Sequence, residues 1–364
     1  MKKNSMNTNI KKAAKLHNSA ITHREQGEYE KAKQSASRAL KIIEQELGSD
    51  HPYMANLLNN LAFIHEAQGD YDSAERLFHQ SVDIMKTEQG EDIENLRTQS
   101  SIGLARIYCA KGQYSEAENL LKNAMAIAEQ SSGPDNMLIA DVLNNLAVLY
   151  KYQGRFDDAE KLYRQVLPII EKALGPEHPE IASVYHNLGG LEHSRGRYAD
   201  GEPFARRSVE IREKALGQNH PYVAADITAL AAILDGQKKY DEAEKLYQRA
   251  LKIFQKVYGK DHYEIAVSLN NLAAIAYQKG NYTEAEQKYK RALEIKEKIL
   301  GSDSPDVAMT LNNLAVLYKS QKRFKEAELI YSRSLSIYEK TLEPTHPNLV
   351  ICRENYAKLL QEMK

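Results

Sequence analysis

The chain has 364 residues, of which 42% are hydrophobic and 27% are charged, ordinary proportions for a folded protein. Its 49 Lys and Arg residues balance 50 Asp and Glu residues, and the resulting net charge of -1 argues against a nucleic-acid-binding protein. No stretch approaches the ~18 consecutive apolar residues of a membrane-spanning helix, and no apolar core of a signal peptide follows the basic N-terminus. We therefore expect neither a nucleic-acid nor a membrane partner.

An aromatic residue that follows a helix break recurs through the chain at a nearly constant interval. These aromatics are Tyr29, Tyr71, Tyr114, Phe156, Tyr198, Tyr240, Tyr282 and Phe324. Six of the seven intervals between them are 42 residues, and one, from Tyr71 to Tyr114, is 43. A fixed period of this length indicates a stack of repeats, each burying its apolar face against its neighbours. Because such a stack presents a long continuous surface, we expect binding rather than catalysis.

Each repeat is predicted to form two helices. Within residues 261–300, apolar residues from Ile265 to Ala276 recur at three- and four-residue spacing, which predicts an amphipathic helix. Gly280 and Asn281 break this helix, and Ala285 to Leu293 predict a second helix with the same period. The sequence shows no alternating pattern of β-branched residues that would predict strands.

Polar residues near the start of the second helix have the spacing of a capping box, in which an N-cap side chain and a Glu three residues later satisfy free backbone N–H groups. The pairs are Asp72 and Glu75, Ser115 and Glu118, Asp157 and Glu160, Asp241 and Glu244, and Thr283 and Glu286. Histidines also recur in the loops between repeats, at His51, His178, His220, His262 and His346. Because they lie at least one repeat apart, we expect them to cap helices or shape turns rather than to share a metal ion.

Small residues occupy one position in each helix, 12 residues apart, as at Ala147 and Ala159. This order of small residue, aromatic turn and Ala resembles the tetratricopeptide repeat. The first helix contains Leu-Asn-Asn-Leu-Ala, as at residues 143–147, and the second ends in Leu-Gly-x-x-His-Pro, as at residues 174–179. This 42-residue variant resembles the repeats of kinesin light chains and their bacterial relatives, without the coiled coil that binds the motor.

The resemblance implies an all-α solenoid, a right-handed superhelix of eight helix pairs with a C-terminal capping helix. A HEAT or armadillo solenoid is the alternative, since its period also reaches the forties, but the 12-residue spacing favours tetratricopeptide repeats. We expect a disordered tail over residues 1–8 and a single solenoid over residues 9–364. The expected repeats span about 13–46, 55–88, 98–131, 140–173, 182–215, 224–257, 266–299 and 308–341, followed by a closing helix over 347–363.

One segment departs from the regular pattern. Pro168 falls inside a predicted second helix, and several glycines and Pro203 follow it. An interior proline removes a helical hydrogen bond, and each glycine adds backbone freedom. Residues 168–203 are therefore predicted to form either a bend or soft joint, or a region of closer helix packing with one ordinary kink.

The resemblance also implies a binding surface, because the first helices of tetratricopeptide arrays line a concave groove. Carried over by position, the peptide-binding residues are Asn59, Asn60, Arg106, Asn144, Asn145, Lys151, His186, Asn187, Asn270, Asn271, Tyr277, Asn312, Asn313 and Lys319. An amide both donates and accepts hydrogen bonds, so a row of amides can pair with the backbone of an extended peptide. Alternatively, the second Asn of each pair bonds the neighbouring helix and holds the stack together.

The tyrosines that recur between the helices have a different expected role. Tyr163, Tyr247, Tyr289 and Tyr331 appear once per repeat, and a periodic aromatic stripe of this kind is typical of a helix-packing core.

No motif of a catalytic or nucleotide-binding site is present, and no set of His, Cys and acidic residues has metal-ligand spacing. We expect no enzyme activity, no cofactor and no metal. Cys109 and Cys352 lie about six repeats apart, beyond disulfide reach, which fits the reducing cytoplasm.

The predicted function is a cytoplasmic, non-enzymatic scaffold or adaptor that binds a protein or an extended peptide in the groove. The alternative is a peptide-responsive regulator that acts through a change of superhelical pitch. An exposed end repeat would also permit self-association.

Overall fold

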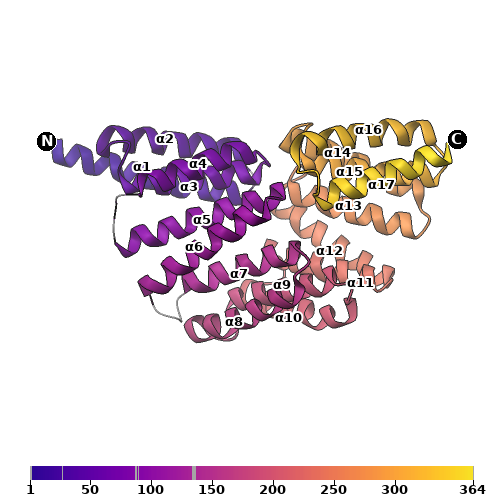
Figure 1. Cartoon of the computed structure of the whole chain (residues 1–364), viewed down its shortest axis with the longest axis horizontal. Coiled ribbons are helices and arrows are strands. Elements are labelled where there is room, and N and C mark those ends of the chain that lie inside the picture. Colours follow the sequence, from indigo (N-terminus) through magenta and orange to yellow (C-terminus); the bar gives the residue numbers. More distant parts are fainter. Residues whose placement is uncertain (1, 27, 87, 89, 133–136, 364) are drawn as a thin grey trace. The chain divides into compact units, whose positions relative to one another are not determined.

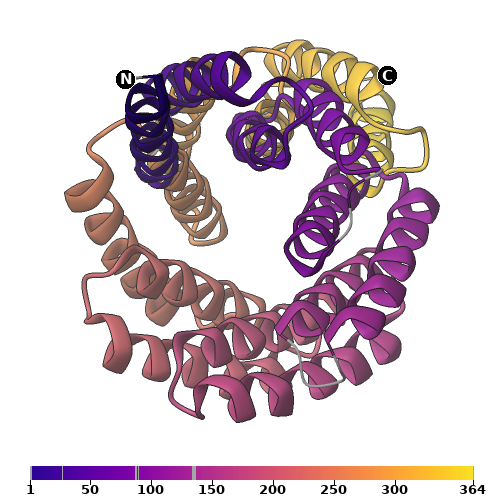
Figure 2. The same ribbon diagram turned by 90° about the vertical axis from the view of Figure 1, so that its left-hand side faces the viewer.

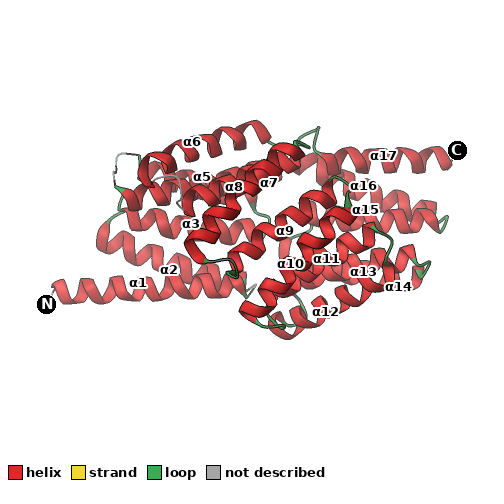
Figure 3. Cartoon of the chain, turned by 90° about the horizontal axis from the view of Figure 1, so that it is seen from below, coloured by secondary structure: helices red, strands yellow, loops and turns green. Residues whose placement is uncertain are grey.

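The structure is a computed structural model that describes residues 2–26, 28–86, 88, 90–132 and 137–363. All regular secondary structure in these ranges is helical (Figure 3). The all-α, helical-repeat class predicted from the sequence is therefore confirmed. Contacts divide the chain into two compact units, Met1–Leu149 and Tyr150–Lys364, and each is described by itself.

The first unit contains six helices and most of a seventh (Figure 1). These are α1 (Lys2–Glu25), α2 (Tyr29–Leu47), α3 (Pro52–Ala67), α4 (Tyr71–Ile84), α5 (Glu91–Lys111), α6 (Tyr114–Ser132) and α7 (Met137–Tyr152). The second unit begins with the last residues of α7. It continues with α8 (Phe156–Leu174), α9 (Pro179–Ser194), α10 (Tyr198–Leu216), α11 (Pro221–Gly236), α12 (Tyr240–Tyr258), α13 (Tyr263–Gln278), α14 (Tyr282–Leu300), α15 (Pro305–Ser320), α16 (Phe324–Thr341) and α17 (Pro347–Glu362).

The N-terminal boundary differs from the sequence expectation. Helix α1 begins at Lys2, whereas a disordered tail is predicted over residues 1–8. Asn9 Nδ2 donates to Glu46 Oε1 of α2 over 2.6 Å, and Ile10 packs against the apolar core between α2 and α3. These contacts with the next helix support α1 upstream of the predicted repeat.

Within each unit the helices form two layers. The helices α1, α3 and α5 of the first unit and α9, α11, α13 and α15 of the second each pack against the even-numbered helix that follows, through a short connection (Figure 1, Figure 2). Odd-numbered helices also contact each other, joining α1 to α3 and α3 to α5 in the first unit, and α9 through α17 in the second. No comparable contact joins two even-numbered helices within the described part of either unit. The odd-numbered helices therefore form one continuous layer, and the even-numbered helices cover its other side.

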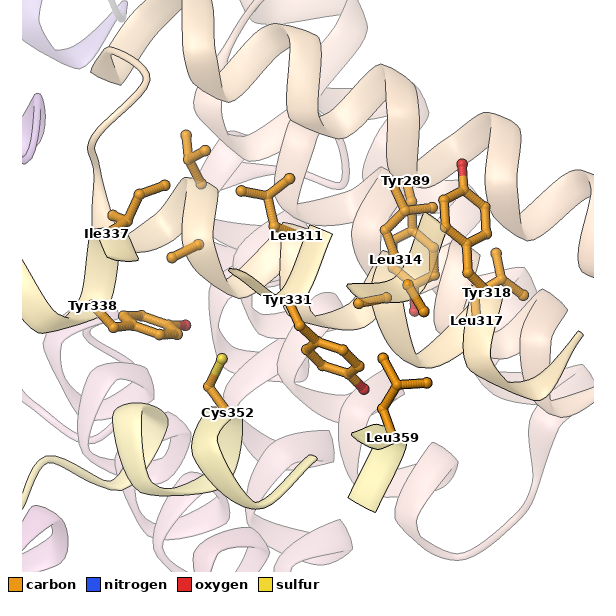
Figure 4. Close-up of a cluster of buried hydrophobic side chains, with 14 of the residues drawn as sticks. Tyr289, Leu311, Leu314, Leu317, Tyr318, Tyr331, Ile337, Tyr338, Cys352 and Leu359 are labelled. Carbon is orange, nitrogen blue, oxygen red and sulfur yellow. The ribbon is translucent and has the colours of Figure 1, made fainter. Parts of the chain in front are cut away.

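Aromatic residues fill the space between the layers, as the periodic stripe predicts. Tyr163, Tyr247, Tyr289 and Tyr331 are all at most 4% exposed, which confirms their place in the core. In the last repeat, Cys352 of α17 lies between the side chains of Tyr331 and Tyr338 of α16 (Figure 4). The closing helix thus covers apolar surface that the last helix pair would otherwise expose.

The close approach of α9 and α10 explains two of the glycines in the irregular segment. A Cβ atom on Gly201 would lie 3.1 Å from the carbonyl oxygen of Gly189, tighter than ordinary contacts. Helix α8 continues through Pro168 without interruption. This close packing matches one of the two alternatives for residues 168–203, and a soft joint there stays a prediction.

The predicted capping boxes are wrong. Helix α14 begins at Tyr282 rather than after Thr283, and its N-cap, Asn281, makes no side-chain capping bond. Gly280 has a φ of 78°, and this left-handed turn brings the chain into the helix two residues earlier than expected.

The first-turn carboxylates instead bind the next repeat. Asp72 and Glu75 lie 2.6 and 2.8 Å from Lys111 Nζ, and Asp241 and Glu244 lie 2.8 and 2.9 Å from Lys279 Nζ. These residues form ion pairs between neighbouring repeats rather than helix caps.

The predicted capping role of the loop histidines is confirmed. Each accepts a hydrogen bond at Nδ1 from the backbone N–H two residues later, over 3.1 to 3.2 Å, at His51, His178, His220, His262 and His346. Ser304 occupies the same position before α15 and accepts the equivalent bond through Oγ over 3.3 Å. The caps fix where the odd-numbered helices begin.

Candidate functional site

One position near the C-terminal end of each odd-numbered helix forms a row, because residues one repeat apart occupy equivalent places in the odd-numbered layer. We call this set the inner row. Its members are Arg24, Glu66 and Cys109 in the first unit, and Lys151, His193, Asp235, Tyr277 and Lys319 in the second. Five of them are Lys, Arg, Asp or Glu side chains, which the chain could offer to a charged ligand.

In the first unit the charges of the inner row are already paired. Glu66 Oε1 lies 2.8 Å from Arg106 Nη2. The guanidinium groups of Arg24 and Arg106 lie 5.6 and 5.8 Å from the centre of the Phe63 ring. Burial raises the pKa of Glu66, and the two arginines oppose that rise. Arg106, a predicted binding residue, is thus engaged within the protein itself.

The last charge of the row is paired as well. Lys319 Nζ lies 2.8 Å from Glu362 Oε1, which belongs to the closing helix α17. Its neighbour Tyr277 is half-buried and has its ring centre 5.9 Å from that of Tyr282. Both predicted residues therefore lie on the odd-numbered layer, but the Lys319 ammonium already has an ionic partner.

The middle of the row is different. Lys151 and Asp235 are both partly exposed, and neither takes part in an ion pair with any residue that the structure describes. Burial alone lowers the pKa of Lys151 and raises that of Asp235, so each shift favours the neutral form. His193 stands between these two residues in the row. Burial, and to a lesser degree the charge of Lys151, lowers the pKa of His193.

Asp235 is not among the binding residues predicted from the sequence, although its position in the repeat could have identified it. It lies 42 residues after His193 and 42 before Tyr277, at the same position of the repeat. Only its lack of an ionic partner makes it notable, and that property depends on the side chains of neighbouring repeats.

Several predicted amides bond neighbouring helices rather than facing solvent. Asn313 Nδ2 donates to Asn270 Oδ1 over 3.3 Å, and Asn355 Nδ2 donates to Asn312 Oδ1 over 3.4 Å. In both pairs the second Asn of one odd-numbered helix binds the first Asn of the preceding one. This arrangement matches the alternative in which the amides hold the stack together.

The two amides of α3 are deeply buried. Asn59 is 2% exposed and its Oδ1 accepts a bond from Ser100 Oγ over 2.9 Å. Asn60 is 5% exposed, and neither of its amide atoms has a hydrogen-bond partner in the described part of the chain.

The other predicted amides lie partly exposed on the same layer. Asn145 Nδ2 donates to the carbonyl oxygen of Asp141 within α7 over 2.8 Å. Asn144 and Asn187 are half-buried and make contacts within the protein, and Asn271 is also half-buried. For these four residues, a role in ligand binding stays a prediction.

His186 has a 37% exposed side chain and joins a buried ion pair between Arg212 and Asp226. Its Nδ1 lies 2.9 Å from Asp226 Oδ1, while Arg212 Nε donates to Asp226 Oδ2 over 2.6 Å. Arg212 also donates to Ser183 Oγ over 3.0 Å. Asp226 and Arg212 are 2% and 8% exposed, so the network ties α9, α10 and α11 together.

A separate hollow of about 570 Å³ lies beside the start of α8. Cations and acids of its lining pair with each other, with Arg195 2.7 Å from Asp157 and Arg155 3.1 Å from Asp158. The ion pair between Arg195 and Asp157 thus joins neighbouring repeats, as the other inter-repeat ion pairs do.

Among the described residues, no group of three or more His, Cys, Asp or Glu side chains is arranged to hold a metal ion. No described helix combines the length and the apolar character that crossing a membrane requires.

Helix pairs of constant length, stacked so that one helix of each pair forms a continuous layer, define a helical-repeat protein of the α-solenoid class. The tetratricopeptide repeat family matches the chain over residues 12–87, 96–172, 138–214, 180–256, 223–298, 264–340 and 306–364. The chain therefore belongs to the tetratricopeptide repeat family. No curated protein matches it.

Solved structures with similar folds include kinesin-light-chain-type repeats. BtubC (BKLC) from P. vanneervenii is 24% identical, with a TM-score of 0.48 over 70% of this chain and 92% of that chain. A Podosopora anserina protein described as a kinesin light chain with nearly identical TPR-like repeats is 28% identical, with a TM-score of 0.45 over 57% of this chain and 97% of that chain. A Rap protein complexed with Competence and Sporulation Factor is 12% identical, with a TM-score of 0.59 over 97% of this chain and 99% of that chain.

Proposed function

We propose that the chain is a non-enzymatic adaptor that binds an extended peptide, or an unstructured segment of a partner protein, along the inner row of the second unit. Proteins of the tetratricopeptide repeat family are typically interaction scaffolds, which supports a protein or peptide partner. The observation that carries the proposal is the pair of partly exposed, unpaired charges at Lys151 and Asp235.

The free-energy cost of desolvating Lys151 and Asp235 favours a bound ligand beside them. Desolvating a charge without a partner is unfavourable, and a folded protein normally pairs such groups. The chain does so for Glu66 and Lys319 of the inner row. A bound segment that supplies hydrogen bonds and opposite charge would relieve the cost at Lys151 and Asp235. The half-buried Asn271 and Tyr277 would add polar and aromatic contacts beside them.

The similar fold of a Rap protein complexed with Competence and Sporulation Factor is compatible with this role. At 12% identity, however, that likeness bears on the fold alone, and the binding proposal rests on the inner row of this chain.

Selection from a random peptide library tests the proposal. Immobilised protein should enrich peptides that bind it, and the double variant Lys151→Ala/Asp235→Ala should bind them at least ~10-fold more weakly, because charge-assisted contacts are worth about 1.5–3 kcal/mol each. The control is Lys325→Ala/Asp303→Ala, which removes one exposed lysine and one exposed aspartate outside the inner row.

Circular dichroism should report the same helix content for both double variants. Failure to enrich any peptide would remove the proposed function. Equal binding by the two double variants would move the site away from the inner row.

A further inference from the structure

Lys151 and Asp235 carry opposite charges at the same position of repeats that lie two periods apart, 84 residues along the chain. We propose that the segment bound along the inner row carries one acidic and one basic side chain about five or six residues apart, the acid meeting Lys151 and the base meeting Asp235. This inference rests on the proposed function and adds the chemical class of the ligand.

Most other half-buried cations of the chain have a partner within the protein. Lys111 pairs with Asp72 and Glu75, Arg323 pairs with Glu286 at 2.7 Å, and Arg97 donates to the backbone carbonyl oxygens of Met85 and Glu88. Two charged members of the inner row form ion pairs within the protein, Glu66 with Arg106 in the first unit and Lys319 with Glu362 in the second. In the second unit, Lys151 and Asp235 are a cation and a carboxylate of the row that have no ionic partner among the described residues; the Lys151 ammonium lies 5.3 Å from the centre of the Tyr152 ring.

The signs of the two charges select the chemistry of the ligand. An ammonium group that protein desolvates on most sides favours a carboxylate, and a desolvated carboxylate favours an ammonium or guanidinium group. A ligand of single charge would satisfy one site and be repelled at the other, so opposite charges on one segment give the best complementarity. Between the two charges lies His193, whose ring is neutral at pH 7 because its pKa lies below the usual 6.5.

The repeat geometry sets the spacing. Helices α9 and α11 are in direct contact, and packed helices lie about 8–10 Å apart. Lys151 and His193 occupy the same position of successive repeats, 42 residues apart, so we take the same step from α7 to α9. Two steps therefore cover about 16–20 Å, and an extended chain advances about 3.3–3.6 Å per residue, which gives five or six residues.

The test is a selection from random peptides of about 12 residues, long enough to span both charges. Peptides enriched on the unmodified protein should pair an acidic with a basic residue at a separation of about five or six, in one chain direction. Single variants separate the two ends. Lys151→Gln should lose the preference for the acid and keep that for the base, and Asp235→Asn should do the opposite, each with a loss of roughly tenfold for the unmodified peptides.

The reversal variant Lys151→Glu/Asp235→Lys gives the sharpest result, because it should enrich peptides with the two charges exchanged. Its matched control, Lys325→Glu/Asp303→Lys, should keep the original preference. Should the reversal variant lose its helical circular dichroism, the two neutral variants still decide the question.

The outcomes distinguish the two proposals. Enriched peptides that bind the inner row without a paired acid and base would overturn the inference and leave the proposed function standing. Enrichment of no peptide at all would overturn both.

Discussion

At the scale of single residues, the caps of the odd-numbered helices link stability to pH. His262 is 8% exposed, stacks on Tyr258 with ring centres 3.9 Å apart, and accepts the backbone N–H of Glu264 at Nδ1. A protonated ring could not accept this bond, and burial lowers the pKa of His262 to about 4. The folded protein therefore keeps His262 neutral where an unfolded chain would protonate it.

His262→Ser should remove part of the pH dependence of stability. The unfolded state takes up a proton near pH 6.5 and the folded state only near pH 4, so stability is lost as the pH falls through this interval. The loss from this one residue is on the order of 3 kcal/mol at most. Ser304 caps α15 in the same way, so the variant should keep its stability at pH 7 to within ~1 kcal/mol. Urea unfolding at pH 7 and near pH 4 measures both values, and an identical loss in the two proteins would contradict this assignment.

Sequence alone predicts the capping histidines, because His-Pro before a periodic helix is a local signal. It does not predict the fate of Asp157 or Glu244, which have capping-box spacing but bind cations of the next repeat. It likewise gives no reason for Gly103, where Asn stands in most repeats. In the structure, any Cβ atom at Gly103 would overlap the ring of Phe78 from α4. Each of these outcomes depends on a side chain some 25 to 40 residues away in sequence.

At the scale of helices, one interface replaces an apolar contact with a buried ion pair. Arg212 of α10 and Asp226 of α11 occupy positions that hold Ile43 and Leu57 in the first repeats, where both side chains are fully buried in one apolar cluster. The sequence reveals the unusual Asp226, since Leu or Val stands at that position in several repeats. Its partners Arg212 and His186 become evident only when the helices are packed.

Breaking this ion pair should cost more than removing it. Arg212→Met leaves the Asp226 carboxylate buried with the hydrogen bond to His186 but without its cation, and we expect a loss of about 3–5 kcal/mol in the free energy of unfolding. Arg212→Met/Asp226→Leu builds an apolar contact like that between Ile43 and Leu57 and should return to within ~1 kcal/mol of the original stability. Urea unfolding followed by circular dichroism gives both values. A double variant as unstable as the single one would show that the pair does more than fill this interface.

At the scale of the whole molecule, the constant period determines most of what can be predicted. It sets the helix pairs, the buried tyrosines and the position of the odd-numbered layer, because each depends on contacts repeated in every copy. The charge state of the inner row is less predictable, since Glu66 and Lys319 find partners on neighbouring helices while Lys151 and Asp235 do not. The amides show the same limit, because Asn270 and Asn312 bind the next helix instead of remaining open.

The central claim is that an extended segment lies along the inner row. Photo-cross-linking tests it most directly, with a benzoylphenylalanine placed at Tyr277 on the odd-numbered layer or at Leu329 on the even-numbered helix α16, where the side chain is 72% exposed. Peptides enriched by the intact protein should cross-link to the variant at Tyr277 and not to the variant at Leu329. Cross-linking from Leu329 alone, or equally from both positions, would contradict the account.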